Sequence, residues 1–291
     1  MDINKKISLA AEMACLLEVS VEKPGNVTPQ HDFSDTKYED FLISAAAIRN
    51  AFTNASGSSV GEIIVKAVKD TKALTKTNTN LGIILLLAPL ARAFTFPAHS
   101  LRNNLKSVLQ SLTIKDAELA YKAIRLAAPG GMGRVSENDI NDKKINITLI
   151  EAMEQAKDRD SIAGEYASGY EITLDIGLPV LRETLKKEIS VSDAIVQTFL
   201  TILSQVPDTL ISRKKGKEAA KNVSDRADAV LKSGGIYTKK GREEINALDL
   251  FLRKDENSFT QSNSLNPGTT ADLAAAVLFV YLMENELKIV R

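Results

Sequence analysis

The chain has 291 residues, of which 44% are hydrophobic and 25% are charged. This length and composition allow a substantial buried core, so extensive disorder is excluded. Lysine and arginine together number 37, as do aspartate and glutamate, and the formal net charge is therefore zero. Because no overall positive field exists, nucleic acid and anionic membranes are not expected as partners, and any anion site must be local.

Cysteine and histidine are scarce. Cys15 is the only cysteine, which excludes an internal disulfide and a cysteine-based zinc cluster, and its apolar helical surroundings indicate a packing role. His31 and His99 are the only histidines, so no site can contain several imidazoles. The many carboxylates still allow oxygen ligation of a hard cation, and Mg²⁺ is the expected metal.

Neither a secretion signal nor a membrane span is predicted. Residues 1–6 contain no continuous apolar segment, and the longest apolar stretch, residues 81–91, is too short for a bilayer and contains Pro89. We therefore expect a cytoplasmic protein.

Apolar residues recur at helical spacing along most of the chain, whereas strand-like alternation is scarce. No repeat, long linker or shift in composition divides the chain. The prediction is an all-α fold, a single-domain multi-helix bundle spanning residues 1–291 with active-site loops at helix termini. The first two apolar faces cover residues 7–17 and 41–48, and further helices are predicted at 59–74, 80–95, 99–110, 115–127, 147–159, 170–187, 191–205, 216–233, 238–254 and 269–287.

The first polar motif follows the first helix. Glu18 is followed by Lys23-Pro24-Gly25-Asn26 and then by His31-Asp32, in a charged loop broken by proline and glycine. Lys23 can neutralise phosphate, while Glu18, His31 or Asp32 can ligate a cation or accept a proton. The alternative is an ordinary helix exit.

The second motif, Thr77-Asn78-Thr79-Asn80-Leu81-Gly82, precedes a very apolar helix. Its polar side chains can cap the first N–H groups of that helix. Alternatively, Gly82 allows a ligand to approach the backbone, and the positive end of the helix attracts a phosphate.

Two central segments carry weaker signals. Pro129-Gly130-Gly131-Met132-Gly133-Arg134 lacks the Gly-Lys-Ser/Thr ending of a P-loop and follows a helix, so the P-loop and Rossmann interpretations are rejected. Glu151, Glu154, Asp158 and Asp160 are spaced for one helical face, which is usually a solvated face.

The last two motifs open later helices. Asp208-Thr209 precedes a short helical segment with Arg213, Lys214, Lys215 and Gly216, for which a helix cap with a basic end is the alternative. Asn266-Pro267-Gly268-Thr269-Thr270-Ala271-Asp272 opens the final helix, and Thr269 with Asp272 has the spacing of a capping box.

In this order, the motifs resemble those of the triphosphoribosyl-dephospho-coenzyme A synthase family, from about Cys15 to Leu282. The matching strings are Glu18-Val19 with Lys23-Pro24-Gly25 and His31-Asp32-Phe33, then Asn78 to Gly82, then Asp208-Thr209 with Arg213 and Gly216, and finally Asn266 to Leu273. Residues 123–166 resemble the archaeal branch of the family. The chain departs from the family at Asn80 and Leu81, which replace a histidine and a lysine.

The resemblance implies transfer of the triphosphoribosyl group of ATP to the 2′-hydroxyl of 3′-dephospho-CoA, with release of adenine. It implies phosphate or nucleotide binding by Lys23, Gly25, Asn78, Thr79, Gly82, Arg213 and Gly268. Catalytic roles fall to Glu18 and Asp32 as proton acceptors and to Asp208 and Asp272, which are also the expected Mg²⁺ ligands.

Other functions stay open on the sequence alone. The acceptor can be a pterin or a coenzyme precursor, or the chain can be a non-catalytic helical nucleotide-binding protein. His31-Asp32 also suggests a metal-dependent phosphohydrolase, although such sites normally need further histidines. The apolar helices at 81–91 and 273–282 pack either within the monomer or across a homodimer.

Overall fold

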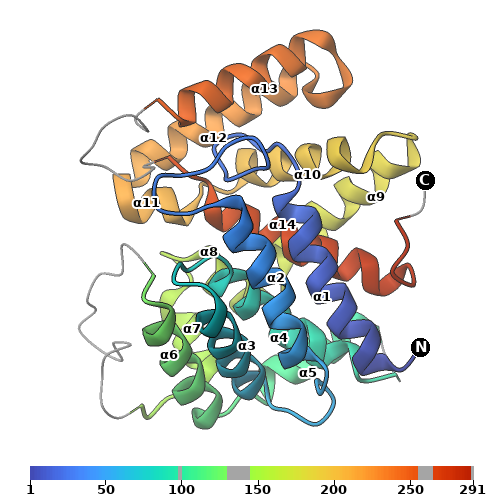
Figure 1. Cartoon of the computed structure of the whole chain (residues 1–291), viewed down its shortest axis with the longest axis vertical. Coiled ribbons are helices and arrows are strands. Elements are labelled where there is room, and N and C mark those ends of the chain that lie inside the picture. The colour runs from blue at the N-terminus through green and yellow to red at the C-terminus, as the bar shows by residue number, and fades with distance from the viewer. Residues whose placement is uncertain (98–99, 130–144, 255–264, 290–291) are drawn as a thin grey trace.

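The structure is a computed structural model that describes residues 1–97, 100–129, 145–254 and 265–289 (Figure 1). Over these ranges the fold is all-α, as predicted, and His31 forms only an isolated β-bridge with Thr28. The helices are α1 (Ile3–Val19), α2 (Tyr38–Phe52), α3 (Val60–Leu74), α4 (Leu81–Phe94), α5 (Leu101–Gln110), α6 (Ile114–Ala127), α7 (Leu149–Ala156), α8 (Ser161–Ser168), the π-helix η1 (Ile172–Gly177), α9 (Leu178–Lys186), α10 (Val191–Gln205), α11 (Thr209–Lys215), α12 (Lys217–Lys232), the 3₁₀ turn η2 (Gly235–Tyr237), α13 (Lys239–Leu252) and α14 (Gly268–Glu284).

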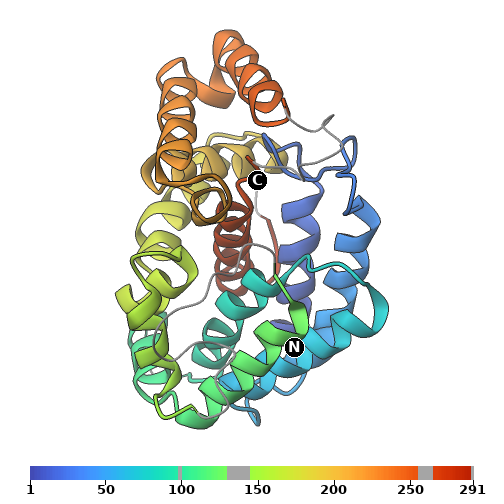
Figure 2. The same ribbon diagram turned by 90° about the vertical axis from the view of Figure 1, so that its left-hand side faces the viewer.

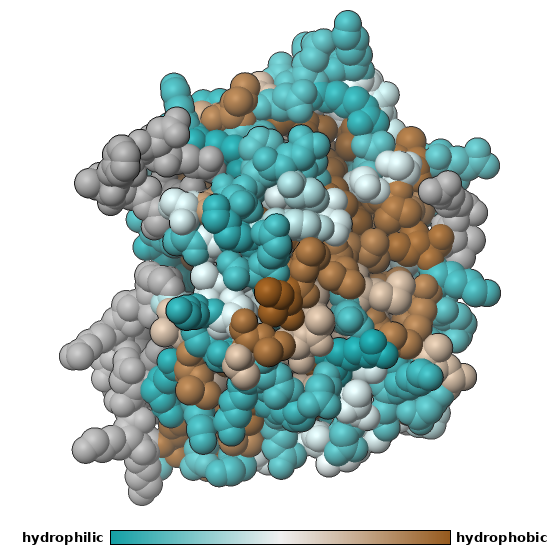
Figure 3. All heavy atoms as spheres, in the orientation of Figure 1, coloured by the Kyte–Doolittle hydropathy of each residue, from teal (hydrophilic) through white to brown (hydrophobic). Residues whose placement is uncertain are grey.

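Helix α14 lies in the middle of the molecule in both ribbon views (Figures 1 and 2). Its side chains are buried on nearly every face, as expected for a helix that is apolar all round. It is surrounded by helices α1, α4, α9 and α10, which pack against it. The start of α14 therefore lies inside the helical assembly. Figure 3 shows that apolar side chains also gather over the middle of the face seen in Figure 1, among polar ones.

Helix α4 is the second core helix, and Pro89 lies inside it. Proline has no N–H, so the carbonyl of Leu85, four residues earlier, loses its helical donor. The hydroxyl of Tyr166 donates to this carbonyl at 2.6 Å, and the hydroxyl of Tyr170 donates to the carbonyl of Leu86 at 2.8 Å. These buried tyrosines therefore supply hydrogen-bond donors to carbonyls near the proline, and they attach to α4 the segment that contains α8 and η1.

The helix predicted over 147–159 is α7, and a further helix that was not predicted follows it. Helix α7 ends at Ala156, and the carboxylate of Asp160 caps a new helix, α8, by accepting a hydrogen bond from the backbone N–H of Ile162 at 2.9 Å. The predicted single acidic face is therefore wrong: Glu151 completes a capping box with Thr148 at the start of α7, whereas Asp160 begins the next helix.

The segment predicted as a helix over 170–187 begins as the π-helix η1. Glu165 is fully buried and accepts hydrogen bonds from the N–H groups of Ile172 at 2.8 Å and Thr173 at 2.9 Å. Desolvation outweighs these hydrogen bonds and raises the pKa of Glu165 to about 7.

Glu165 should make stability depend on pH. Its folded pKa of about 7 lies above the unfolded value, so between about pH 4.3 and that value only the folded state holds the proton. The contribution of Glu165 to stability is therefore largest below this window and should fall by roughly 3 kcal/mol as the pH rises through it. Urea unfolding between pH 4 and 8 measures the slope, which Glu165→Gln should flatten. The exposed Glu244→Gln control should retain it, and equal slopes in both variants would contradict the prediction.

Cys15 is buried in the hydrophobic core, which confirms its packing role.

In the described ranges, no single helix is long and apolar enough to cross a membrane; α10 and α11 meet the length and composition criteria only as a pair bent by 53°.

Candidate active site

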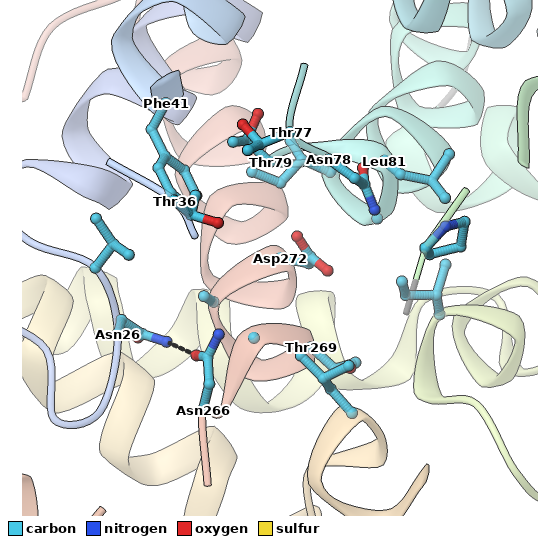
Figure 4. A pocket seen from close by; sticks show the side chains of 18 of the residues that line it. Asn26, Thr36, Phe41, Thr77, Asn78, Thr79, Leu81, Asn266, Thr269 and Asp272 are labelled. Atoms are coloured by element: carbon cyan, nitrogen blue, oxygen red, sulfur yellow. Dashed lines mark hydrogen bonds between the residues drawn. The ribbon is translucent and has the colours of Figure 1, made fainter. Parts of the chain in front are cut away.

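A cavity of about 900 Å³ lies where the start of α14 meets the starts of α4, α8 and α11 (Figure 4). Residues from the end of α1, the following loop and the end of α6 complete its wall. Seven residues predicted for the site line it: Glu18, Asn78, Thr79, Gly82, Arg213, Gly268 and Asp272. Segments far apart in the sequence thus contribute to one site.

Three helix starts on the wall are linked by hydroxyl groups. The N–H of Ser161 in α8 donates to the hydroxyl of Thr209 in α11 at 3.3 Å, and this hydroxyl donates to that of Thr269 in α14 at 3.2 Å. The starts of α4, α8 and α14 place positive helix ends at the same cavity. Such ends favour an anionic group of a ligand.

The polar residues before α4 do not cap it by side-chain hydrogen bonds. Asn80 stands at the cap position but makes no such bond to the helix, and its amide donates instead to the carbonyl of Ser44 at 3.3 Å. The hydroxyl of Thr79 donates to the hydroxyl of Ser44 at 2.5 Å. The motif therefore anchors the loop to α2 and leaves the start of α4 facing the cavity, with Leu81 on the wall.

Asp272 projects into the centre of the cavity from the first turns of α14 (Figure 4). A methyl group on Gly82 would overlap its carboxylate, so glycine at this position lets the carboxylate lie against α4. Burial, followed by the negative charges of Glu18 and Asp208, raises the pKa of Asp272 well above the usual aspartate value. The predicted capping box is wrong, because α14 begins at Gly268 and has no side-chain cap from its N-cap residue, Pro267.

Glu18 and Lys23 form a buried ion pair beside this carboxylate. Glu18 lines the cavity but is only 4% exposed, and the Lys23 ammonium lies 3.0 Å from its Oε1 atom. The ammonium also donates to the backbone carbonyls of Glu18 and Val21. Lys23 is 1% exposed and does not line the cavity, so the structure places it behind Glu18 rather than at a phosphate position.

The cationic part of the wall belongs to α11. Arg213, Lys214 and Lys215 line the cavity, and Arg213 Nη1 lies 2.7 Å from the Asp160 carboxylate. This ion pair joins α8 to α11. The Nε atom of Arg213 is buried without a hydrogen-bond partner in the described ranges, so the guanidinium still has an unused donor.

Asp208 is buried and does not line the cavity. Its Oδ1 atom accepts from the N–H groups of Leu210 and Ile211, which confirms the capping alternative, and its Oδ2 atom accepts from the N–H and hydroxyl of Thr270. Burial raises the pKa of Asp208 despite these hydrogen bonds. Both of its oxygens therefore serve to join the starts of α11 and α14.

The residues present do not fit an Mg²⁺ ion held by protein ligands alone. In the described ranges, no group of three or more histidine, cysteine, aspartate or glutamate side chains could hold a metal ion. Asp208 was predicted to bind the metal together with Asp272, but its two oxygens accept four hydrogen bonds from the protein. Asp272 therefore lacks the predicted second ligand.

Asp32 and Gly25 also lie away from the cavity wall. Asp32 accepts a hydrogen bond from the Tyr38 N–H at 2.8 Å and pairs with Lys37 at 3.2 Å, and its pKa is lowered chiefly by the hydrogen bond from Tyr38. Gly25 has a φ of +74°, and its N–H donates to Asp249 at 2.8 Å. Gly25 therefore shapes the loop and docks it on α13.

Several wall residues were not predicted as site residues from the sequence: Asn26, Phe33, Phe41, Asp160, Lys214, Asn266 and Thr269. A local signal existed for Asp160, because an aspartate before Ser161-Ile162 is a good N-cap for a second helix. No local pattern distinguishes the others from loop or core residues. Pro129 lines the cavity, whereas residues 130–134 of its glycine-rich string, like His99, lie outside the described residues.

Comparisons with known proteins cover nearly the whole chain. The family model for ATP:dephospho-CoA triphosphoribosyl transferase (CitG) matches residues 4–290. A protein of Malonomonas rubra described as "probable 2-(5''-triphosphoribosyl)-3'-dephosphocoenzyme-A synthase" is 26% identical over 301 residues, or 98% of this chain and 89% of its own. A protein of Acinetobacter calcoaceticus with the same description is 26% identical over 298 residues, or 97% and 92% of the two chains.

A solved structure agrees with these matches. The crystal structure of a "putative triphosphoribosyl-dephospho-coA synthase" from Archaeoglobus fulgidus has a TM-score of 0.62 and 29% sequence identity to this chain. The match covers 84% of this chain and 98% of that one. The resemblance inferred from the ordered motifs, including its archaeal character, is confirmed, and the chain belongs to the ATP:dephospho-CoA triphosphoribosyl transferase family.

Proposed function

We propose that this protein transfers the triphosphoribosyl group of ATP to the 2′-hydroxyl of 3′-dephospho-CoA. The bond between C1′ of the ATP ribose and adenine N9 breaks, and C1′ forms a new bond to the acceptor oxygen. The acceptor hydroxyl loses a proton, adenine gains one, and the triphosphate stays intact. The main support is that Glu18, Asp272 and the cationic residues of α11 line one cavity in a chain of this family.

The triphosphate should lie at the end of the cavity lined by α11. Arg213 and Lys214 supply positive charge there, and Gly268 and Thr269 at the start of α14 bring a positive helix end. A guanidinium held by one carboxylate keeps its other donors for phosphate oxygens, and Asp160 holds Arg213 in this way. Asn78, Thr79 and Gly82, on the wall at the start of α4, complete the predicted nucleotide-binding surface.

The two central carboxyl groups suit opposite proton transfers. Glu18 has a buried ammonium as its partner, whereas the pKa of Asp272 is raised by burial and by neighbouring negative charges. Groups whose surroundings differ in this way can act as a base and an acid at the same pH. We assign Glu18 to accept the proton of the 2′-hydroxyl and Asp272 to donate a proton to the departing adenine.

Magnesium enters this proposal as the counter-ion of the ATP triphosphate. Mg²⁺ usually keeps several waters and binds through substrate phosphates with one or two carboxylates. The predicted ligand pair of Asp208 and Asp272 is not retained, because Asp208 accepts four protein hydrogen bonds. Neither proton transfer proposed above depends on a protein-bound metal.

The test is incubation of the pure protein with MgATP and dephospho-CoA, followed by chromatography and mass spectrometry. Adenine and the triphosphoribosyl adduct of dephospho-CoA should form in equal amounts. Inorganic phosphate measured in the same samples reports hydrolysis instead. Failure to release adenine with this acceptor would contradict the proposal. The predictions of a homodimer and of a cytoplasmic location stay as predictions.

A further inference from the structure

Two asparagine side chains from distant segments meet on the cavity wall. Asn26 follows Gly25 in the loop after α1, and Asn266 precedes α14. The Nδ2 atom of Asn26 donates to the Oδ1 atom of Asn266 at 2.8 Å, and both residues line the cavity (Figure 4). Asn26 is 5% exposed, and its Oδ1 atom is buried with no hydrogen-bond partner in the described ranges.

This pairing leaves a particular set of polar atoms. A side-chain amide has two N–H donors and one carbonyl, and the single bond between the residues uses a donor of Asn26 and the carbonyl of Asn266. The carbonyl of Asn26 has no protein partner in the described ranges, and this bond does not use the N–H groups of Asn266. If both amides are rotated, a donor and an acceptor are still left on the pair. A buried amide oxygen without a donor is costly, which points to a ligand that supplies one.

The backbone around the pair is held in place. The Nη2 atom of Arg253 donates to the backbone carbonyl of Asn26 at 2.7 Å, and the Gly268 N–H donates to the carbonyl of Asn266 at 2.9 Å. The loop of Asn26 is thus attached to the end of α13, and the Asn266 backbone is hydrogen-bonded to the start of α14. The two amides are therefore positioned before a ligand binds.

The pair lies on the side of the cavity opposite Leu81, which belongs to the start of α4 (Figure 4). In Figure 4, Asn26, Thr36 and Phe41 lie on one side of Asp272 and Leu81 lies on the other, while Thr269 lies below Asp272. Phe33 and Phe41 give this end aromatic surface, which suits the flat face of a nucleobase. Asp272 then lies between base and triphosphate, where C1′ of the nucleotide must be.

We propose that Asn26 and Asn266 recognise the 6-amino edge of adenine and thereby select ATP among nucleoside triphosphates. This inference rests on the proposed function and adds the residues that choose the donor substrate. Adenine carries an N–H donor at its 6-amino group beside a ring-nitrogen acceptor, the pattern that asparagine amides bind in nucleic-acid recognition. Asn26 accepts from the 6-amino group, and Asn266 donates to the neighbouring ring nitrogen N1.

The test compares ATP with purine riboside triphosphate, which lacks only the 6-amino group. For the wild-type protein, kcat/KM with dephospho-CoA should be about 10 to 100 times higher for ATP. In Asn26→Ala this ratio should fall to near one. Because both substrates are measured on one preparation, the ratio does not depend on the fraction of folded enzyme. Asn78→Ala, which removes an amide near α4, should keep the wild-type ratio.

A second variant tests the other amide. Asn266→Asp replaces the donor by an acceptor, so the preference for ATP over inosine triphosphate, whose ring N1 carries a hydrogen, should shrink by about 10-fold or more. An unchanged ATP to purine riboside ratio in Asn26→Ala would overturn the inference. If the wild-type protein releases no adenine from ATP, the proposed transfer is wrong. The preference for ATP over each analogue is then measured as a ratio of Kd values by calorimetry, which still tests the adenine contact.

Discussion

Replacing Asp272 by asparagine is expected to lower kcat for adenine release by about 1,000-fold, with a small change in KM for ATP. Asparagine has nearly the same shape but cannot transfer a proton to the departing base. The free energy of unfolding at pH 7 should be unchanged or higher, because the neutral amide relieves the unfavourable surroundings that raise the pKa of Asp272. Single-turnover kinetics and urea unfolding of the same preparation measure both effects.

Asp208→Asn is the matched control for this prediction. Asp208 is also a buried aspartate at a helix start, but its two oxygens accept four hydrogen bonds from Leu210, Ile211 and Thr270. An amide nitrogen cannot accept from two of these donors, so the variant should lose about 2 kcal/mol of stability. The folded fraction should keep most of its activity. If Asp272→Asn loses stability as Asp208→Asn does and keeps its kcat, the assigned proton transfer is wrong.

Lys23→Met should lower kcat by about 100-fold or more while leaving KM for ATP nearly unchanged. Lys23 is buried behind Glu18, so its removal leaves the Glu18 carboxylate without its positive partner on the cavity wall. Loss of one partner of a buried ion pair also costs about 3 kcal/mol or more of stability. Steady-state kinetics and urea unfolding of the same preparation measure both effects.

The same measurements distinguish a positioning lysine from a phosphate-binding one. A phosphate-binding Lys23 would instead raise KM for ATP strongly at an unchanged kcat. Lys115→Met is the control, since Lys115 pairs with Glu118 at the surface, where an ion pair contributes little to stability. The double variant Lys23→Met with Glu18→Gln should recover stability but not activity, because both buried charges are then absent.

Many residues of the site could be predicted from the sequence because they lie at the starts of helices. Asn78, Thr79 and Gly82 precede or open α4, and Gly268 and Asp272 open α14. Apolar periodicity and N-cap residues are local signals, so they predict where helices begin. The N-cap signal at Asp160 was also present but was not used, because Asp160 was grouped with the acidic residues of the preceding helix.

The sequence by itself determined the all-α class, the burial of Cys15, the position of most helices and, through ordered motifs, the family. Tertiary structure alone decided which polar residue faces the cavity and which one supports another element. Asp208 reaches Thr270 across 62 residues, and Asn26 reaches Asn266 across 240, contacts that no local pattern encodes. Lys23 shows the physical reason: a lysine in a loop with proline and glycine is expected to be exposed, and only the packing of the fold buries its ammonium against Glu18.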